Sequence, residues 1–156
     1  MGIAKACWHY LKYILWHKWY VFLECCRLGI PWLGIIHDWG KFAPSEFILH
    51  IRVYYGSDGR PIRNYRGDER LDSAWLLHQR RHKHHWQWWV MIGKDGRVKA
   101  IEMPDKYRRE LLADWRGAGV VQGRPNTAAW YTEHNHKMNL HPRKRQWLET
   151  QLGVSR

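Results

Sequence analysis

Hydrophobic residues recur at three- and four-residue spacings along most of the chain, a pattern typical of amphipathic helices. In the first such segment Tyr10, Ile14, His17 and Val21 fall on one helix face. Glycine and proline separate this segment from the next, as at many helix boundaries. The pattern predicts helices at about 5–28, 31–39, 43–55, 69–89, 105–117, 126–137 and 141–152, with a break of the fourth near Lys83.

Two segments depart from the helical period. Residues 90–101 carry β-forming residues on both sides of Asp95-Gly96, a turn dipeptide, and so predict a small β-hairpin. Residues 56–68 are rich in glycine, aspartate and arginine and predict a mobile loop. We therefore expect an all-α bundle of six to seven helices with one hairpin, formed as a single domain over residues 1–156.

Charge and cysteine usage narrow the class of protein. The formal net charge of +12 favours phosphate-bearing partners, either a small molecule such as a nucleotide or a nucleic acid. The most apolar region, residues 13–36, is interrupted by charged residues and Pro31, so we expect no membrane partner. Three cysteines without a CxxC motif indicate a reducing, cytoplasmic compartment. The sequence does not predict the oligomeric state.

The candidate chemistry centres on the dipeptide His37-Asp38, which follows an apolar run and precedes Gly40-Lys41. An imidazole and a carboxylate from neighbouring residues can reach one divalent cation. Histidines and one further aspartate surround the dipeptide in sequence, and the complete set of candidate ligands is His17, His37, Asp38, His78, His84, His85 and Asp114.

Seven candidate ligands exceed what one tetrahedral site requires. They fit two divalent transition-metal ions, with iron, manganese, nickel, cobalt or zinc as candidates, and with Asp38 as the bridging carboxylate. Two such ions can activate water for attack on a phosphate. We expect Asp38 and Lys41 to be catalytic, Lys41 by balancing charge on a phosphoryl oxygen, and we expect the substrate phosphate to be held by Arg80, Arg81 and Lys83.

The order of these residues resembles the HD-domain superfamily of metal-dependent phosphohydrolases. The whole chain is more closely similar to an uncharacterised HD-like family from bacteria and phages, through YLKY at 10–13, HKWYV at 17–21, GIIHD at 34–38, KFAPSEF at 41–47, WLLH at 75–78, HHW at 84–86, MPDKY at 103–107 and ADW at 113–115. The resemblance implies a helical bundle with these metal ligands, in the cytoplasm of a bacterial or phage-infected cell. It supplies no substrate. His82 departs from the pattern, where we expect asparagine in relatives, and either adds a ligand or is exposed.

Three function classes follow. The first is a metal-dependent phosphohydrolase acting on a nucleotide or another small phosphoester. The second is a mixed-valence di-iron oxygenase that uses the same ligands. The third is a basic nucleic-acid-binding module with a structural metal. Glu110, one helical turn before Asp114, either orients a ligand histidine or lies on a helix surface, and we expect the histidines outside the candidate set to be on the surface, namely His9, His50, His134, His136 and His141.

Overall fold

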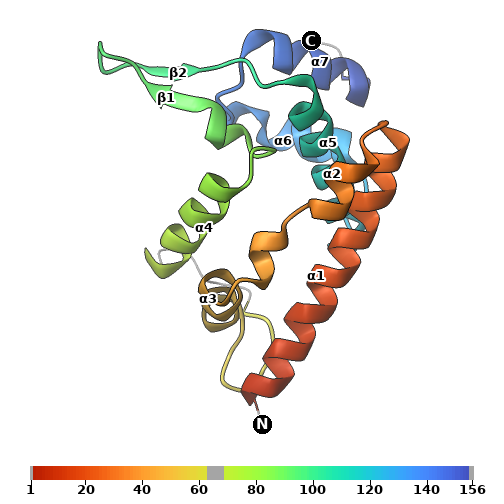
Figure 1. Cartoon of the computed structure of the whole chain (residues 1–156), viewed down its shortest axis with the longest axis vertical. Helices are drawn as coiled ribbons and strands as arrows, with labels where there is room; N and C mark the ends of the chain where they lie inside the picture. The colour runs from red at the N-terminus through yellow and green to blue at the C-terminus, as the bar shows by residue number, and fades with distance from the viewer. Residues whose placement is uncertain (1, 63–68, 155–156) are drawn as a thin grey trace. The chain divides into compact units, whose positions relative to one another are not determined.

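Helices account for most of the structure, a computed structural model that describes residues 2–62 and 69–154 (Figure 1). Within those ranges the seven α-helices are α1 (Gly2–Arg27), α2 (Pro31–Ile36), α3 (Pro44–Tyr54), α4 (Glu69–Arg81), α5 (Asp105–Val121), α6 (Thr127–His134) and α7 (Pro142–Leu152). The described residues also form three short 3₁₀ helices, η1 (Trp39–Phe42), η2 (Trp86–Trp89) and η3 (Asn135–Lys137). Strands β1 (Val90–Ile92) and β2 (Val98–Ala100) form one antiparallel hairpin. The predicted helical fold class is confirmed.

The largest differences from the predicted elements lie beside the histidines. The second helix ends at Ile36 rather than near residue 39. The fourth ends at Arg81, close to the break predicted near Lys83, and the predicted remainder up to residue 89 contains only the 3₁₀ helix η2. In both places the backbone leaves the helix just before a candidate ligand. The predicted loop at 56–68 falls partly outside the described residues, and its described part includes a single β-bridge between Tyr55 and Pro61.

The chain divides into two compact units, which we call unit 1 and unit 2. Unit 1 consists of Met1–His17 and Asp38–His82, and unit 2 consists of Lys18–His37 and Lys83–Arg156. Helix α1 therefore supplies its first part to unit 1 and the remainder to unit 2. The expectation of a single domain stays a prediction.

Unit 1 is held together by an aromatic and aliphatic core. Ala6, Tyr10 and Ile14 are buried on successive turns of α1, and Ile51 of α3 packs against them. The ring of Tyr10 lies 5.1 Å from that of Phe47, measured between centroids. This packing holds the part of α1 that leads to His17 against α3.

Unit 2 has two hydrophobic clusters that share α5. In the first, Leu111 and Leu112 of α5 pack with Tyr131 of α6 and Leu148 of α7. In the second, Ala113 packs against Val21 and Cys25 of α1. Gly117 permits the close approach of α1 and α5, because a Cβ at that position would lie 2.6 Å from Cγ2 of Val21.

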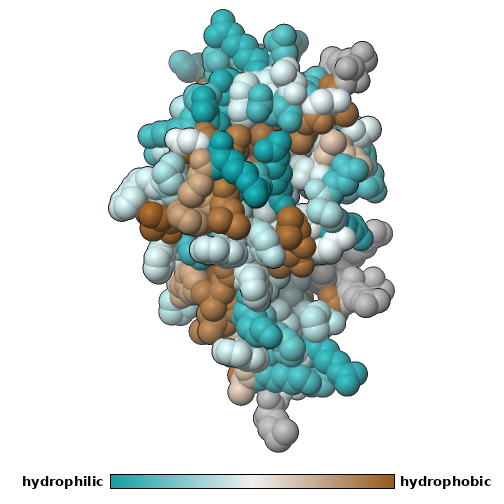
Figure 2. Space-filling view, turned by 90° about the vertical axis from the view of Figure 1, so that its right-hand side faces the viewer, coloured by the Kyte–Doolittle hydropathy of each residue, from teal (hydrophilic) through white to brown (hydrophobic). Residues whose placement is uncertain are grey.

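Large hydrophobic side chains also lie on the surface. Trp8, Trp19 and Trp32 are each more than half exposed. On the face drawn in Figure 2, hydrophobic side chains interrupt the hydrophilic surface. Every helix in the described residues is too short or too polar to span a membrane.

Lys144 of α7 is a charged residue in the interior of unit 2, with only 3% of its surface exposed. Burial disfavours the ammonium form and lowers the pKa of Lys144 from 10.5 to about 7. Between these two values the unfolded chain binds more protons than the folded chain, so stability rises with pH.

We expect Lys144→Met to be more stable than the wild type at neutral pH, because methionine fills the same space without a buried charge. The wild type should recover toward the variant by about 1 kcal/mol per pH unit as the pH rises above about 7. Urea unfolding across a pH series measures both effects, with the exposed Lys137→Met as the control. Parallel pH profiles for wild type and Lys144→Met would contradict the burial of the charge.

Candidate metal sites

The segment between α2 and η1 positions the central dipeptide. His37 follows the last residue of α2, and Asp38 adopts a left-handed conformation with φ of 52°. Aspartate tolerates this conformation better than most residues, because its short polar side chain can form local hydrogen bonds. The sequence placed both residues within a helix, which is wrong. His37 belongs to unit 2 and Asp38 to unit 1.

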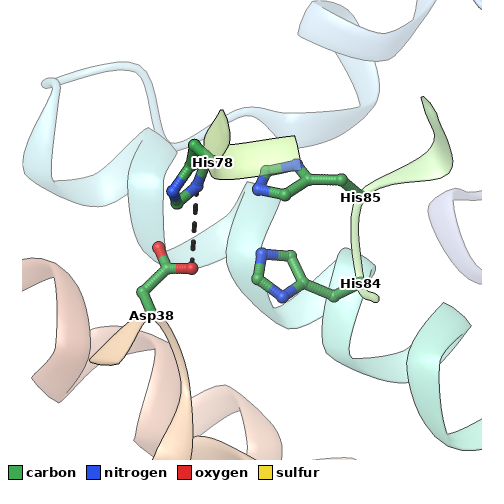
Figure 3. Close-up of side chains that lie close together, drawn as sticks. All are labelled: Asp38, His78, His84 and His85. Carbon is green, nitrogen blue, oxygen red and sulfur yellow. Dashed lines mark ion pairs between the residues drawn. The ribbon is translucent and has the colours of Figure 1, made fainter. Parts of the chain in front are cut away.

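In unit 1, three elements place side chains around Asp38. One oxygen, Oδ2, lies 3.4 Å from Nε2 of His17 on α1 and 2.6 Å from Nζ of Lys41 on η1. The other, Oδ1, lies 3.7 Å from Nε2 of His78 on α4, an ion pair marked in Figure 3. His17, Asp38 and His78 are all buried. We call the following six residues the unit 1 cluster: His17, Asp38, Lys41, Glu46, His78 and His82.

Glu46 of α3 orients His78 from the opposite side of the ring. Nδ1 of His78 donates to Oε2 of Glu46 over 3.0 Å, and Arg81 donates to Oε1 over 2.6 Å. Burial alone would raise the pKa of the Glu46 carboxyl, but the hydrogen bonds from His78 and Arg81 outweigh burial and lower it to about 2. Glu46 is therefore a carboxylate at neutral pH. It turns Nε2 of His78 toward Asp38.

His82, the departure from the family pattern, also lies at the unit 1 cluster. Its Nδ1 is 3.7 Å from Oδ1 of Asp38, and its side chain is mostly buried. A Cβ on Gly40 would lie 2.6 Å from Nε2 of His82 and 3.0 Å from Oε1 of Glu46. Because Gly40 has no side chain, the His82 ring can occupy this space. Glu46, His78 and His82 could together hold a metal ion.

In unit 2, His37 and His84 lie between two acidic residues of α5. Nδ1 of His37 donates to Oε1 of Glu110 over 3.1 Å, and its Nε2 is 3.5 Å from Oδ1 of Asp114. His84 makes longer approaches of 3.3 Å from Nδ1 to Glu110 and 3.9 Å from Nε2 to Asp114. We call these four buried residues the unit 2 cluster. His37, His84 and Glu110 could hold a metal ion.

The electrostatics of Glu110 match those of Glu46. Burial would raise the pKa of the Glu110 carboxyl, but the hydrogen bonds with His37 and His84 outweigh burial and lower it. A buried, charged carboxylate beside two imidazoles favours the ring tautomers that direct an N–H group toward the carboxylate. Glu110 is therefore buried and hydrogen-bonded to His37, and it does not lie on a helix surface, which was one of the two positions that the sequence left open.

The two clusters repeat one arrangement. In each, a glutamate accepts from Nδ1 of a histidine whose Nε2 faces an aspartate, at 3.7 Å in unit 1 and 3.5 Å in unit 2. An ion bound at about 2.0–2.2 Å by tetrahedral ligands holds its donor atoms about 3.4 Å apart. Metal-ligating histidines typically donate their second nitrogen to a carboxylate in this way. The donor sets therefore fit divalent metal ions.

The remaining predicted site residues have mixed environments. Lys41 contacts Asp38, as described above. Arg81 is bound to Glu46 and to Ser45, whereas Arg80 is exposed. Lys83 is exposed on unit 2, with its ammonium 5.7 Å from the Trp88 ring centroid. The buried His85 ring lies 4.2 Å from that of His84 between centroids, and Figure 3 draws both rings.

Two residues of unit 1 were not predicted at the site. Glu46 was interpreted only as an acidic residue in the first turn of a helix, although it lies in the KFAPSEF motif. His50 was expected on the surface, which is wrong, because it is buried and donates from Nδ1 to the carbonyl of Glu46 over 2.9 Å. The four-residue spacing of Glu46 and His50 on one helix face was the signal available for both.

Fold and site together define a helical protein with buried histidine–carboxylate clusters that could hold metal ions. A comparison with protein-family models gives a match over nearly the full length of the chain. The chain belongs to DUF5662, a family of unknown function, whose model matches residues 6–154. No curated protein and no solved structure matched the chain.

Proposed function

We propose that this chain is a metal-dependent phosphohydrolase that acts on a nucleotide or another small phosphoester. The observation that carries the proposal is the repeated glutamate–histidine–aspartate arrangement, because it orients imidazole nitrogens and carboxylates as metal ligands require. The resemblance of the ligand order to the HD-domain superfamily supports the same chemistry. The net charge of +12 supports a phosphate-bearing substrate.

In this proposal each cluster binds a divalent ion. His17, Asp38 and His78 are ligands in unit 1, and His37, His84 and Asp114 are ligands in unit 2, with His85 as a further ligand. A bound divalent ion supplies an activated water nucleophile and neutralises charge on a phosphoryl oxygen. The chain supplies the orientation of the ligands, through Glu46 and Glu110.

Besides the metal ligands, we assign a catalytic role to Lys41. Its Nζ lies 2.6 Å from Asp38, and only 13% of its side chain is exposed. An ammonium group in such a setting is held next to the ligands and is shielded from water, which strengthens its interaction with negative charge. We assign Lys41 to the phosphoryl oxygens that become more negative during hydrolysis. Arg80 and Lys83 are exposed cations that we assign to substrate phosphate.

The test combines metal content with turnover. Wild-type protein purified without chelator should contain about two metal ions per chain and should hydrolyse members of a phosphomonoester, phosphodiester and nucleotide panel. Lys41→Met should retain the metal but lose about 100-fold or more in kcat, because it removes charge stabilisation and leaves the ligands in place. The exposed Lys12→Met serves as the control.

Three outcomes would contradict the proposal. Absence of metal from the wild type, with none taken up from solution, would make the histidines structural. Iron accompanied by a visible absorption band and oxygen consumption would indicate an oxygenase instead. Unchanged kcat in Lys41→Met would remove that residue from the catalytic assignment.

A further inference from the structure

The hairpin of unit 2 is a short, regular β-ribbon. Its register pairs Ile92 with Val98 and Met91 with Lys99. The turn is closed by hydrogen bonds from the amide of Gly93 to the carbonyl of Arg97 and from the amide of Gly96 to the carbonyl of Gly93. Gly96 has φ of +76°, which glycine adopts without strain. The sequence therefore specifies a defined ribbon at these positions.

Both strands of this ribbon are exposed beyond the hairpin's first residue pair. Ile92 is 71% exposed and its cross-strand partner Val98 is 60% exposed. In Figure 1 the ribbon extends away from α5, α6 and α7 of the same unit. A two-stranded hairpin that buries neither face is only marginally stable in water. The hairpin leaves this apolar pair uncovered, so the pair is available for contact with a partner.

The charge of the ribbon identifies the chemistry of the partner. Lys94, Arg97 and Lys99 are exposed, and Asp95 is the single acidic residue between Val90 and Ala100. Asp95 pairs with Arg97 at 3.9 Å and also caps the turn by accepting from the amide of Arg97. The ribbon therefore presents a net positive charge on a chain whose overall net charge is +12. This charge is complementary to a polyanion.

We propose that the β1–β2 ribbon is a binding arm for double-stranded DNA. A two-stranded β-ribbon fits the major groove of B-form DNA, and basic side chains along it can contact the phosphates on either side. Apolar side chains in the major groove can contact the methyl groups of thymine bases. Ile92 and Val98 supply this apolar contact, and Lys94, Arg97 and Lys99 supply the phosphate contacts.

A second copy of the chain fits the ribbon less well. Symmetric pairing of two ribbons would bring two sets of basic residues close together, and like charges on paired strands are destabilising. The proposal is also independent of the phosphohydrolase assignment, because it needs neither a metal ion nor turnover. A chain without hydrolase activity could still bind DNA through this arm.

The experiment is fluorescence anisotropy of a labelled random-sequence DNA duplex with the whole chain, without added metal, over a series of salt concentrations. The triple variant Lys94→Ala/Arg97→Ala/Lys99→Ala should bind at least about tenfold more weakly. Its plot of log affinity against log salt should be shallower by about 2 to 3, since each lost phosphate contact lowers the slope by about 0.9. The double variant Ile92→Thr/Val98→Thr should bind several-fold more weakly with an unchanged salt slope.

The matched control removes the same charge elsewhere on unit 2, as Lys106→Ala/Arg124→Ala/Lys137→Ala, all at exposed positions. This variant should bind more tightly than the ribbon triple variant. Equal losses in both triple variants would show that net charge alone attracts DNA and would overturn the proposal. So would equal affinity for an RNA duplex, whose major groove is too narrow for a ribbon. Hairpin-dependent self-association without DNA binding would assign the surface to a second copy instead.

Discussion

Asp38→Asn is expected to abolish metal binding by the unit 1 cluster, with a loss of affinity of more than about 100-fold. Changing a residue that only orients a ligand costs about 10–100-fold, and Asp38 is proposed to be a ligand itself. Its two oxygens face His17 and His78 at 3.4 and 3.7 Å, so the substitution removes the carboxylate that faces both histidines. Hydrolysis of phosphoesters should be lost with the metal.

Asparagine is the appropriate replacement because Asp38 has a positive φ. Asparagine also tolerates the left-handed region, so the variant removes charge without adding backbone strain. Asp38→Ala should lose metal equally and should be less stable than Asp38→Asn, because alanine is strained at this φ.

Metal content per chain by mass spectrometry and helicity by circular dichroism measure the effect together. Asp72→Asn, at an exposed position on α4, is the control and should retain the wild-type metal content. If Asp38→Asn keeps both its metal and its activity, the assignment of the unit 1 cluster is wrong.

Glu110→Gln is expected to weaken metal binding by the unit 2 cluster about 10–100-fold while the fold is retained. Glutamine preserves the shape of the side chain and can still accept a hydrogen bond from His37. The negative charge of Glu110 holds the His37 imidazole in its orientation and raises the basicity of the imidazole as a ligand. Glutamine removes that charge. The effect should therefore be on affinity rather than on folding.

Competition with a chromophoric chelator measures this affinity for each ion separately. The exposed Glu133→Gln of α6 provides a control of the same chemistry, and it should bind metal as the wild type does. An unchanged affinity in Glu110→Gln would mean that Glu110 has a packing role alone. Loss of both ions at once would contradict separate metal binding by the two clusters.

Much of the fold could be predicted because its signals are local. The three- and four-residue periodicity of α1, the Pro31 and Pro44 starts and the Asp95-Gly96 turn each depend on a few neighbouring residues. The end of α2 could not be predicted in the same way, whereas the break predicted near Lys83 lies close to the observed end of α4 at Arg81. The sequence continues a helical pattern through the end of α2, where Asp38 adopts a left-handed backbone and its carboxylate contacts His17 and Lys41.

For the candidate site, the sequence by itself determined which residue types are available and in what order, because a histidine–aspartate pair with further histidines has few purely structural explanations. Tertiary structure decided how they are grouped: Glu46 with His78 in one unit, and Glu110 with His37 in the other. The partners in these pairs lie 32 and 73 residues apart along the chain, so no local period relates them. Only the packing of α3 with α4 and of α5 with its unit brings each carboxylate to the nitrogen that it orients.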